Sequence, residues 1–250
     1  MKVSVVIPCR DYVAYLPEAI ESALAQTSPP HQVIVVDDGS RDRSLDVARS
    51  YAQVTTIALD GRGPAAARNA GLDAVTGELV VFLDADDALE PDYLEACLAP
   101  LQANPALGFV YTQVRYVGAR TGVSQHLAYD LERLKRDNTI HASALLRTAA
   151  VRSVRYDEAF AEGFEDWDLY LALAARGVSG FLLDRPLLRY RQHTASRSHA
   201  LKERRSRRYR AQLRLLRKHR ALFSTSERRA LRRKFRRRFL LARAREILGV

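Results

Sequence analysis

Short apolar runs alternate with segments of helical spacing along the first half of the chain. Runs rich in Val, Ile and Leu predict strands at residues 3–8, 32–40, 54–59, 79–83 and 108–117, and those at 32–40 and 79–83 are expected to be buried. Apolar residues three and four positions apart predict helices at residues 11–26, 42–52, 65–74 and 91–104. Strands that alternate with helices build a mostly parallel sheet with helices on both faces. We therefore expect an α/β fold for this part of the chain.

The pattern is less regular beyond residue 118. We expect a loop that passes into a strand over residues 138–147, a helix over 163–177, and strands over 180–183 and 187–193. From residue 201 the spacing is helical again, with a break at residues 223–226. Ser224 or Ser226 is expected to cap the helix that follows, with Glu227 in its first turn.

The net charge of +11 is unevenly distributed. Residues 202–250 hold 20 basic and 3 acidic side chains, whereas residues 1–201 hold 20 basic and 26 acidic ones. The chain is thus an acidic domain followed by a very basic tail, and the boundary is expected near residues 198–202.

Other compositional features predict an ordinary intracellular protein. Two cysteines, Cys9 and Cys97, are too few for a disulfide framework, which favours a reducing compartment. The first residues are too short and strand-like for a signal peptide, and no apolar run approaches the roughly 20 residues of a spanning helix. We expect a cytoplasmic protein, with the basic tail allowing peripheral attachment to the inner face of the plasma membrane.

Three acids follow the strand predicted at residues 79–83, namely Asp84, Asp86 and Asp87. In open α/β sheets, ligands bind outside the carboxyl ends of the strands. Carboxylates crowded there repel one another unless a cation sits among them, and oxygen ligands suit Mg²⁺ or Mn²⁺ with phosphate oxygens. An acidic turn that caps the next helix is the alternative, which explains one aspartate better than three.

Two other predicted strands also end in polar residues, at positions 8–11 and 37–40. In a parallel sheet these ends lie on one edge and can converge on one ligand. The chain has no Gly-x-Gly-x-x-Gly after its first strand and no Walker-type phosphate loop. This argues against a dinucleotide oxidoreductase and a phosphate-loop NTPase, and favours a nucleotide held through carboxylates and a metal.

Six short segments carry a resemblance to a known family through their order and spacing. They are residues 3–8, 35–40, 67–71, 82–87, 165–168 and 190–193. Over about residues 1–200 the chain resembles the family 2 glycosyltransferases of the GT-A fold. The resemblance implies a GT-A (Rossmann-like), mostly parallel central sheet flanked by helices, here with a basic α-helical C-terminal extension. Residues 1–117 would bind the nucleotide sugar, residues 118–200 would hold acceptor and catalytic groups, and residues 201–250 would form the basic amphipathic tail.

The resemblance also implies roles for individual residues. The family is inverting, metal-dependent and specific for nucleotide-diphosphate sugars, and we favour a UDP-sugar here. By this resemblance Asp166 is the catalytic base, Asp86 and His193 meet the Mn²⁺ or Mg²⁺ ion, and Glu165 and Trp167 meet the acceptor. The nucleotide would be bound by Pro8, Asp11, Asp37, Asp38, Arg68 and Asp84.

One departure from the family pattern bears on the nucleotide. Arg10 and Asp11 stand where the family usually has tyrosine and asparagine. The residues that would contact the nucleobase therefore differ from the family pattern, and the identity of the nucleotide stays open.

The chemistry of glycosyl transfer explains why such residues are needed. A divalent ion neutralises the charge that grows on the departing diphosphate, and a carboxylate activates the acceptor hydroxyl. A single displacement with one base inverts the sugar. The charge of Glu165 should raise the pKa of Asp166, whereas the amino end of a helix should lower it, and the sequence does not decide between them.

Plainer interpretations remain beside these roles. Asp166 fits a helix cap, Trp167 fits the core, His193 fits a structural histidine on an apolar strand, and Arg68 fits a surface helix. The tail fits an anionic membrane surface or an apolar stripe packed on the catalytic domain, and less well nucleic acid, since no base-reading pattern accompanies it.

The resemblance thus implies a hexosyltransferase that acts on a glycan or lipid-linked acceptor, as in the synthesis of bacterial cell-surface polysaccharide. A sugar-nucleotidyltransferase is the first alternative, although residues 8–12 lack the glycine-rich loop that such an enzyme normally carries. A non-catalytic basic protein that binds membranes or nucleic acid is the second.

Overall fold

The structure is a computed structural model that describes residues 1–160, 163–193 and 205–248. The strands are β1 Val3–Cys9, β2 Gln32–Asp37, β3 Val54–Ala58, β4 Leu79–Phe82, β5 Ala88–Leu89, β6 Leu107–Gly118, β7 Gly122–Val123, β8 Leu145–Arg147 and β9 Ser179–Gln192. The α-helices are α1 Leu16–Leu24, α2 Ser44–Ser50, α3 Pro64–Ala74, α4 Tyr93–Ala103, α5 Leu131–Leu134, α6 Thr148–Val154, α7 Glu165–Ala174, α9 Arg205–Lys218 and α10 Thr225–Leu248. Short 3-10 turns lie at η1 Glu158–Phe160 and η2 Arg220–Leu222.

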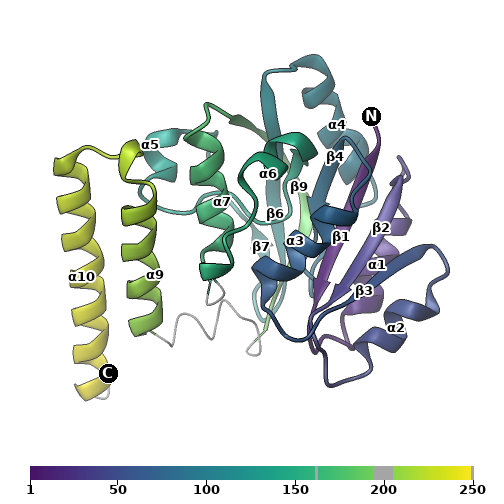
Figure 1. The fold of residues 1–250 in the computed structure, drawn as a ribbon, viewed down its shortest axis with the longest axis horizontal. Coiled ribbons are helices and arrows are strands. Elements are labelled where there is room, and N and C mark those ends of the chain that lie inside the picture. Colours follow the sequence, from purple (N-terminus) through teal and green to yellow (C-terminus); the bar gives the residue numbers. More distant parts are fainter. Residues whose placement is uncertain (161–162, 194–204, 249–250) are drawn as a thin grey trace.

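One sheet runs through the molecule in the order β3-β2-β1-β4-β8-β6-β9-β5, with β7 paired to β6 (Figure 1). Strands β3, β2, β1 and β4 are parallel, as predicted for the first half of the chain. Beyond β4 the sheet is mixed, because β8 is antiparallel to both of its neighbours whereas β6 and β9 are parallel. Separate apolar clusters fill the two faces of the sheet, which gives the expected α/β architecture.

Two predicted elements have different bounds in the structure. The first helix begins at Leu16 and not at Asp11, whose backbone is left-handed with φ +58°. The Asp11 backbone N–H donates to the Ser40 hydroxyl, so the loop is held against β2 instead of continuing into the helix. The strands predicted at residues 180–183 and 187–193 are one long strand, β9, whose register with β6 shifts near Gln113.

The basic tail forms two helices that lie side by side next to α7 (Figure 1). The predicted break falls between them, and Ser224 and Glu227 form a reciprocal cap, with Glu227 N–H on the Ser224 hydroxyl and Ser224 N–H on the Glu227 carboxylate. The predicted domain boundary at residues 198–202 lies outside the described residues, as does the end of the chain at residues 249–250.

The apolar stripe of the tail is buried in the core of the catalytic part. Its members share one cluster with Leu134 of α5 and Trp167 of α7. They are Leu215, Leu216, Phe223, Leu231 and Phe235. Burial of such side chains contributes roughly 1.5–3 kcal/mol each. The interpretation that the stripe packs on the catalytic domain is therefore confirmed, while its exposed arginine face leaves membrane attachment a prediction.

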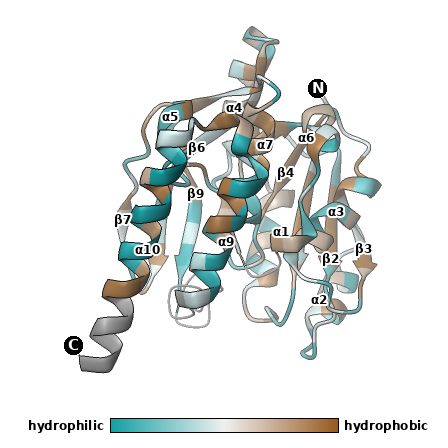
Figure 2. Ribbon diagram, turned by 60° about the vertical axis from the view of Figure 1, so that its left-hand side comes forward, coloured by the Kyte–Doolittle hydropathy of each residue, from teal (hydrophilic) through white to brown (hydrophobic). Residues whose placement is uncertain are grey.

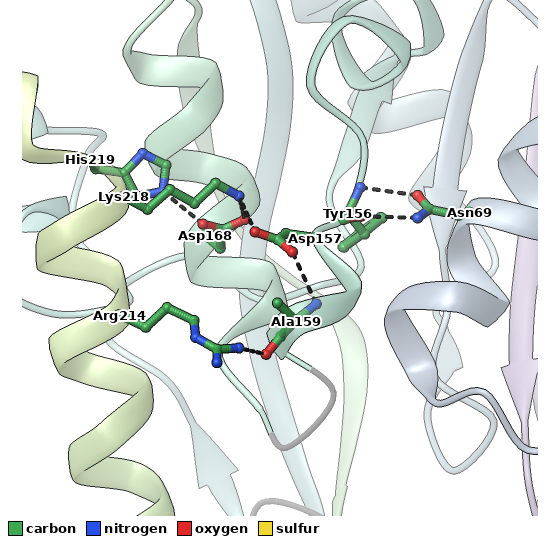
Figure 3. Close-up of polar contacts among 8 residues, drawn as sticks. All are labelled: Asn69, Tyr156, Asp157, Ala159, Asp168, Arg214, Lys218 and His219. Atoms are coloured by element: carbon green, nitrogen blue, oxygen red, sulfur yellow. Dashed lines mark hydrogen bonds and ion pairs between the residues drawn. The ribbon is translucent and has the colours of Figure 1, made fainter.

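Polar contacts reinforce this packing (Figure 3). The carboxylate of Asp168 in α7 is fully buried and lies 2.7 Å from Lys218 Nζ and 2.7 Å from His219 Nε2. Lys218 also lies 2.7 Å from Asp157, and Arg214 donates to the carbonyl of Ala159. None of the described helices is long and apolar enough to cross a bilayer.

Candidate active site

Three chain segments meet at the carboxyl edge of the parallel strands, as the sequence predicted. Cys9 at the end of β1 pairs with Asp37 at the end of β2, and the Asp38 N–H donates to the Cys9 carbonyl at 2.8 Å. Strand β4 pairs with the other side of β1 and leads into Asp84. The polar residues that follow these strands thus share one edge, which is where a nucleotide would be bound in such a sheet.

Asp37 and Asp38 are both buried, but their carboxylates have different surroundings. The two oxygens of Asp38 accept the N–H groups of Arg62 and Gly63 at 2.7 Å each, which fixes the loop that leads into α3. Asp37 Oδ2 accepts from the Ser40 N–H at 3.1 Å, whereas Asp37 Oδ1 is buried without a hydrogen-bond partner among the described residues. An unpaired buried acceptor is costly, so Asp37 Oδ1 is the open acceptor of this pair.

The first loop surrounds these aspartates with partly exposed groups. Pro8 is partly exposed at the end of β1. Arg10, which is 45% exposed in its side chain, places Nη1 3.9 Å from Asp38 Oδ2. The Asp11 carboxylate accepts the Arg41 N–H at 2.6 Å. Arg10, which departs from the family pattern, therefore places its guanidinium beside the predicted nucleobase site.

Asp86 and His193 are brought together although they lie 107 residues apart in sequence. Asp86 Oδ2 is 2.9 Å from His193 Nε2, and each side chain is 14% exposed. The rings of Tyr12 and Tyr15 pack around the imidazole, with centroids 6.0 and 5.0 Å away. Burial, followed by the charge of Asp84, raises the pKa of Asp86 above its usual value.

Asp87 lies behind this pair and is buried. It accepts the backbone N–H of Arg191 at 2.8 Å, and the Arg191 side chain donates to the Asp86 carbonyl. Burial and then the charges of Asp86 and Asp84 raise the pKa of Asp87 well above its usual value. The raised pKa values of Asp86 and Asp87 agree with the repulsion predicted among these acids.

The donor set at Asp86 fits a divalent cation. A carboxylate oxygen faces an imidazole nitrogen, and both types of atom bind Mn²⁺. Within the described residues, no three His, Cys, Asp or Glu side chains form a group that holds a metal by itself. Oxygen atoms of a bound diphosphate would therefore have to complete the coordination, as is usual for Mg²⁺ at nucleotide sites.

Arg68 of α3 connects this edge to α7. Its side chain is 3% exposed, with Nη2 2.6 Å from Asp84 and Nη1 2.8 Å from Glu165. Glu165 is itself 5% exposed in its side chain. The expectation that Glu165 meets the acceptor is corrected accordingly, because its carboxylate is turned inward to Arg68. The contact between Arg68 and the nucleotide stays a prediction.

Asp166 is the second residue of α7 and is only partly buried. Its oxygens accept the Trp167 N–H at 2.8 Å and Asn138 Nδ2 at 2.9 Å. Burial and the charge of Glu165 raise the pKa of Asp166 to about 6, against the lowering effects of Arg68 and the backbone bond. The sequence did not decide whether the pKa of Asp166 is raised or lowered; in the structure the effects that raise it are larger. A raised pKa suits a general base.

Trp167 belongs to the core and not to an acceptor surface. It is 2% exposed, and its indole N–H donates to the Leu134 carbonyl at 2.7 Å. The expectation that Trp167 meets the acceptor is corrected for this reason, since a buried ring has no free face for a sugar.

Two residues at the site were missed in the sequence. Asn138 holds Asp166, but it lies in the irregular stretch before β8, where no pattern pointed to it. Arg191 contacts Asp86 and Asp87, and its position within residues 190–193 was the available signal.

Asn69 fixes the turn before η1 through two hydrogen bonds with the backbone of Tyr156 (Figure 3).

Comparison with known proteins agrees with this geometry. Residues 4–159 match the family model described as Glycosyl transferase family 2. An uncharacterized glycosyltransferase of Nostoc is 39% identical over 116 residues, which make up 44% of this chain and 36% of that protein. The chondroitin synthase of Escherichia coli is 30% identical over 184 residues, or 70% of this chain and 27% of that protein. The matched part thus spans about a third or less of these curated relatives.

Solved structures share the fold. S. aureus TarS 1-349 in complex with UDP-GlcNAc superposes with a TM-score of 0.76 at 20% identity, covering 94% of this chain and 71% of that one. The mannosyltransferase PcManGT from Pyrobaculum calidifontis, in complex with GDP-Man and Mn²⁺, gives a TM-score of 0.65 at 21% identity, covering 87% of this chain and 63% of that one. The predicted architecture is confirmed by these similarities.

Proposed function

Because this chain belongs to glycosyl transferase family 2, we propose that it moves a hexosyl group from a nucleotide-diphosphate sugar to a hydroxyl of a glycan or lipid-linked acceptor, with inversion. The observation that carries the proposal is the linked arrangement of the site. Asp84, beside the Asp86–His193 pair, is joined through Arg68 to Glu165, and Asp166 is the next residue. The proposed diphosphate site and the proposed catalytic base are therefore joined by direct contacts between side chains.

The donor is proposed to be a UDP-sugar bound at the ends of β1 and β2. Asp37 Oδ1 would accept a hydrogen bond from the base, because it is the buried oxygen without a partner. Asp38 would act by holding the loop at Arg62 and Gly63 against the nucleotide. Support comes from structural neighbours whose complexes contain UDP, UDP-GlcNAc and GDP-Man.

Asp86 and His193 would hold a Mn²⁺ or Mg²⁺ ion together with the donor diphosphate. When bound, the ion would neutralise the charge that develops on the departing nucleoside diphosphate. Arg191 and Asp87 keep Asp86 in place through the contacts described above. The neighbouring mannosyltransferase, whose complex contains Mn²⁺, supports this assignment.

Asp166 is proposed to be the catalytic base. The acceptor oxygen attacks the anomeric carbon while the bond from that carbon to the diphosphate oxygen breaks, and the hydroxyl proton passes to Asp166. A single displacement inverts the anomeric carbon, so the base must lie on the face opposite the leaving group. Asn138 holds one Asp166 oxygen, and the raised pKa gives the carboxylate the basicity that proton transfer needs.

Calorimetry with UDP, GDP and dTDP, each with and without Mn²⁺, tests the donor assignment. We expect UDP to bind most tightly and Mn²⁺ to strengthen its binding. In the variant Asp86→Asn the gain from Mn²⁺ should be lost while metal-free binding remains. Equal binding of all three nucleotides, or a gain from Mn²⁺ that survives in Asp86→Asn, would contradict the proposal.

The variant Asp166→Asn tests the base separately. It should lower the transfer rate by about 10²- to 10⁴-fold and leave UDP binding unchanged, because the base acts on the acceptor and not on the donor. Asp157→Asn, which changes an acid near η1 that is 31% exposed, is the matched control and should retain the rate. Transfer that is untouched in Asp166→Asn would refute the assignment.

The setting of the reaction is proposed to be bacterial cell-surface polysaccharide synthesis at the inner face of the plasma membrane. The exposed basic face of the tail would attach the protein to anionic lipid there, near a lipid-linked acceptor. Family membership favours transfer over the sugar-nucleotidyltransferase and over the non-catalytic alternative.

A further inference from the structure

The tail helices enclose a cleft that the predicted active site does not use. It has a volume of about 360 Å³ and lies between α9 and α10. Its walls are Tyr209, Leu213, Arg217, Arg232, Arg233 and Arg236. We call this feature the arginine cleft. Four arginines from two helices thus line one hollow.

The charges of the arginine cleft are not neutralised by the described part of the protein. The side chains of its four arginines make no hydrogen bond or ion pair with a described residue. Glu227, the nearest described acid in the two helices by sequence, is bonded to Lys135 and to the Ser224 N–H. Like charges at such short range repel well inside the Debye length of about 8 Å at physiological salt. An anion in the cleft would relieve this repulsion.

Arginine favours phosphate among the anions that fit such a hollow. Its planar fork donates paired hydrogen bonds to phosphate oxygens, and it is weakly hydrated compared with lysine. All four charged groups that line the cleft are arginines, and Tyr209 and Leu213 add apolar surface beside them. The cleft therefore matches a phosphate group that is attached to an apolar molecule.

Exposed leucines on α10 identify the kind of molecule. Leu240 is 49% and Leu241 is 55% exposed, so two neighbouring large apolar side chains of α10 face water. Leu240 follows Arg236 by four residues and Arg233 by seven, so the three lie on one face of the helix. Arginines that adjoin exposed leucines on one helical face are typical of helices that lie on anionic membranes. Figure 2 shows hydrophilic residues along much of α10, with an apolar segment toward its carboxyl end.

The orientation of the tail agrees with a lipid surface. In Figure 1, the amino end of α9 and the carboxyl end of α10 lie at the same end of the molecule as the carboxyl ends of the parallel strands. Leu240 and Leu241 lie in the carboxyl half of α10, so a membrane that contacts these leucines would lie toward the edge that carries Asp86 and Asp166. Nucleic acid would satisfy the charges but would leave the leucines in water.

We propose that the arginine cleft is a binding site for the phosphate of an anionic phospholipid headgroup. This deepens the membrane attachment proposed above, because it replaces a diffuse charged face by a defined site made by two helices. It does not depend on glycosyl transfer, since UDP binding by calorimetry reports on the donor site in the absence of any lipid.

Vesicle flotation with matched variants of the full chain tests the proposal. The cleft variant carries Arg217→Gln and Arg236→Gln, one change on each wall. The control variant carries Arg237→Gln and Arg238→Gln, which remove the same charge from exposed α10 positions outside the cleft. Vesicles contain phosphatidylcholine alone or phosphatidylcholine with phosphatidylglycerol. Thermal unfolding should show that neither variant is less stable, because both remove repelling charges.

The expected result is a larger loss in the cleft variant than in the control. Both variants remove two arginines from an anionic surface, at about 1 kcal/mol each, so the control should bind phosphatidylglycerol vesicles at most about 30-fold more weakly. The cleft variant should weaken by at least about tenfold more than the control, because only its arginines share charge-assisted hydrogen bonds to a bound phosphate. Inorganic phosphate at millimolar concentration should compete only weakly, since it lacks the apolar part.

Several outcomes would overturn the proposal. Equal loss in the two variants would mean a diffuse basic surface without a site. Equal binding to vesicles of phosphatidylcholine alone would mean that no phosphate charge is recognised. Strong competition by inorganic phosphate would assign the cleft to a free anion, and binding to an oligonucleotide but not to vesicles would assign it to nucleic acid.

Discussion

Replacing Asp168 by asparagine should destabilise the whole protein, because this carboxylate joins the tail to the helix that carries Asp166. The Asp168 side chain is fully buried, and its two oxygens face Lys218 Nζ and His219 Nε2 at 2.7 Å each. Asparagine keeps the volume of the side chain but removes the charge. The variant therefore isolates the electrostatic part of the contact between α7 and α9.

The size of the effect follows from the surroundings of the partners. Removing one member of a buried ion pair costs about 3–5 kcal/mol, because the other charge is left without compensation. Here Lys218 is 36% exposed in its side chain and keeps Asp157 at 2.7 Å, so the cost is reduced. We expect a loss of about 2–3 kcal/mol in the free energy of unfolding. For a chain of this size that corresponds to a fall in Tm of about 4–12 °C.

Thermal unfolding followed by circular dichroism measures this loss. Asp157→Asn is the control, since its salt bridge to the same lysine is partly exposed and should contribute about 0–1 kcal/mol. The double variant with Lys218→Gln should lose less than the sum of the single variants, because the two residues interact directly. If Asp168→Asn melts within about 1 °C of the wild type, or no lower than Asp157→Asn, the reasoning is refuted.

Three further predictions concern the site. The rate of transfer should fall as the pH drops through about 6, because Asp166 has a raised pKa and becomes protonated there. A rate that does not change across this pH would contradict the role of Asp166 as the catalytic base. Asn138→Ala should lower kcat by about 10- to 100-fold, since a hydrogen bond to a charged group contributes about 1.5–3 kcal/mol. It should also move the acid limb of the pH profile to higher pH, because the bond that favours ionised Asp166 is lost. An acid limb that does not move would mean that Asn138 has only a structural role. Arg68→Gln should lower the free energy of unfolding by about 3–5 kcal/mol, measured by urea unfolding, because it leaves the buried Glu165 without its cation. Arg68→Lys should recover only part of this stability. An Arg68→Gln variant as stable as the wild type would show that the salt bridge is dispensable.

The parallel half of the fold followed from local pattern because most of its strands are apolar and largely buried. This holds for β1, β2 and β4, whereas the edge strand β3 is only partly buried. The aspartates at or just after the ends of β1, β2 and β4 fall on one edge by the geometry of parallel pairing. Strand β8 has only three residues, which is too short to produce a pattern, and its antiparallel insertion beside β4 was not predicted. Short strands of this kind are determined by their neighbours and not by their own sequence.

The candidate site divides in the same way. Acids at strand ends were visible in the sequence, but the pairing of Asp86 with His193 joins positions that only the resemblance connected. The inward orientation of Trp167 was one of two interpretations, and its carbonyl partner on Leu134 decided between them. The role of Asn138 could not be predicted from the sequence, because Asn138 lies in a loop without a periodic pattern and acts through its contact with Asp166.

The apolar stripe of the tail has a consequence for how this protein can be shortened. Phe223, Leu231 and Phe235 lie in the same core as Trp167, so a chain that ends before α9 would present that core to water. Such a fragment would be expected to aggregate, and its loss of activity would say nothing about lipid or donor binding. The basic extension and the catalytic part therefore form one folding unit, and the charges of the extension are best studied by substitution in the full-length chain.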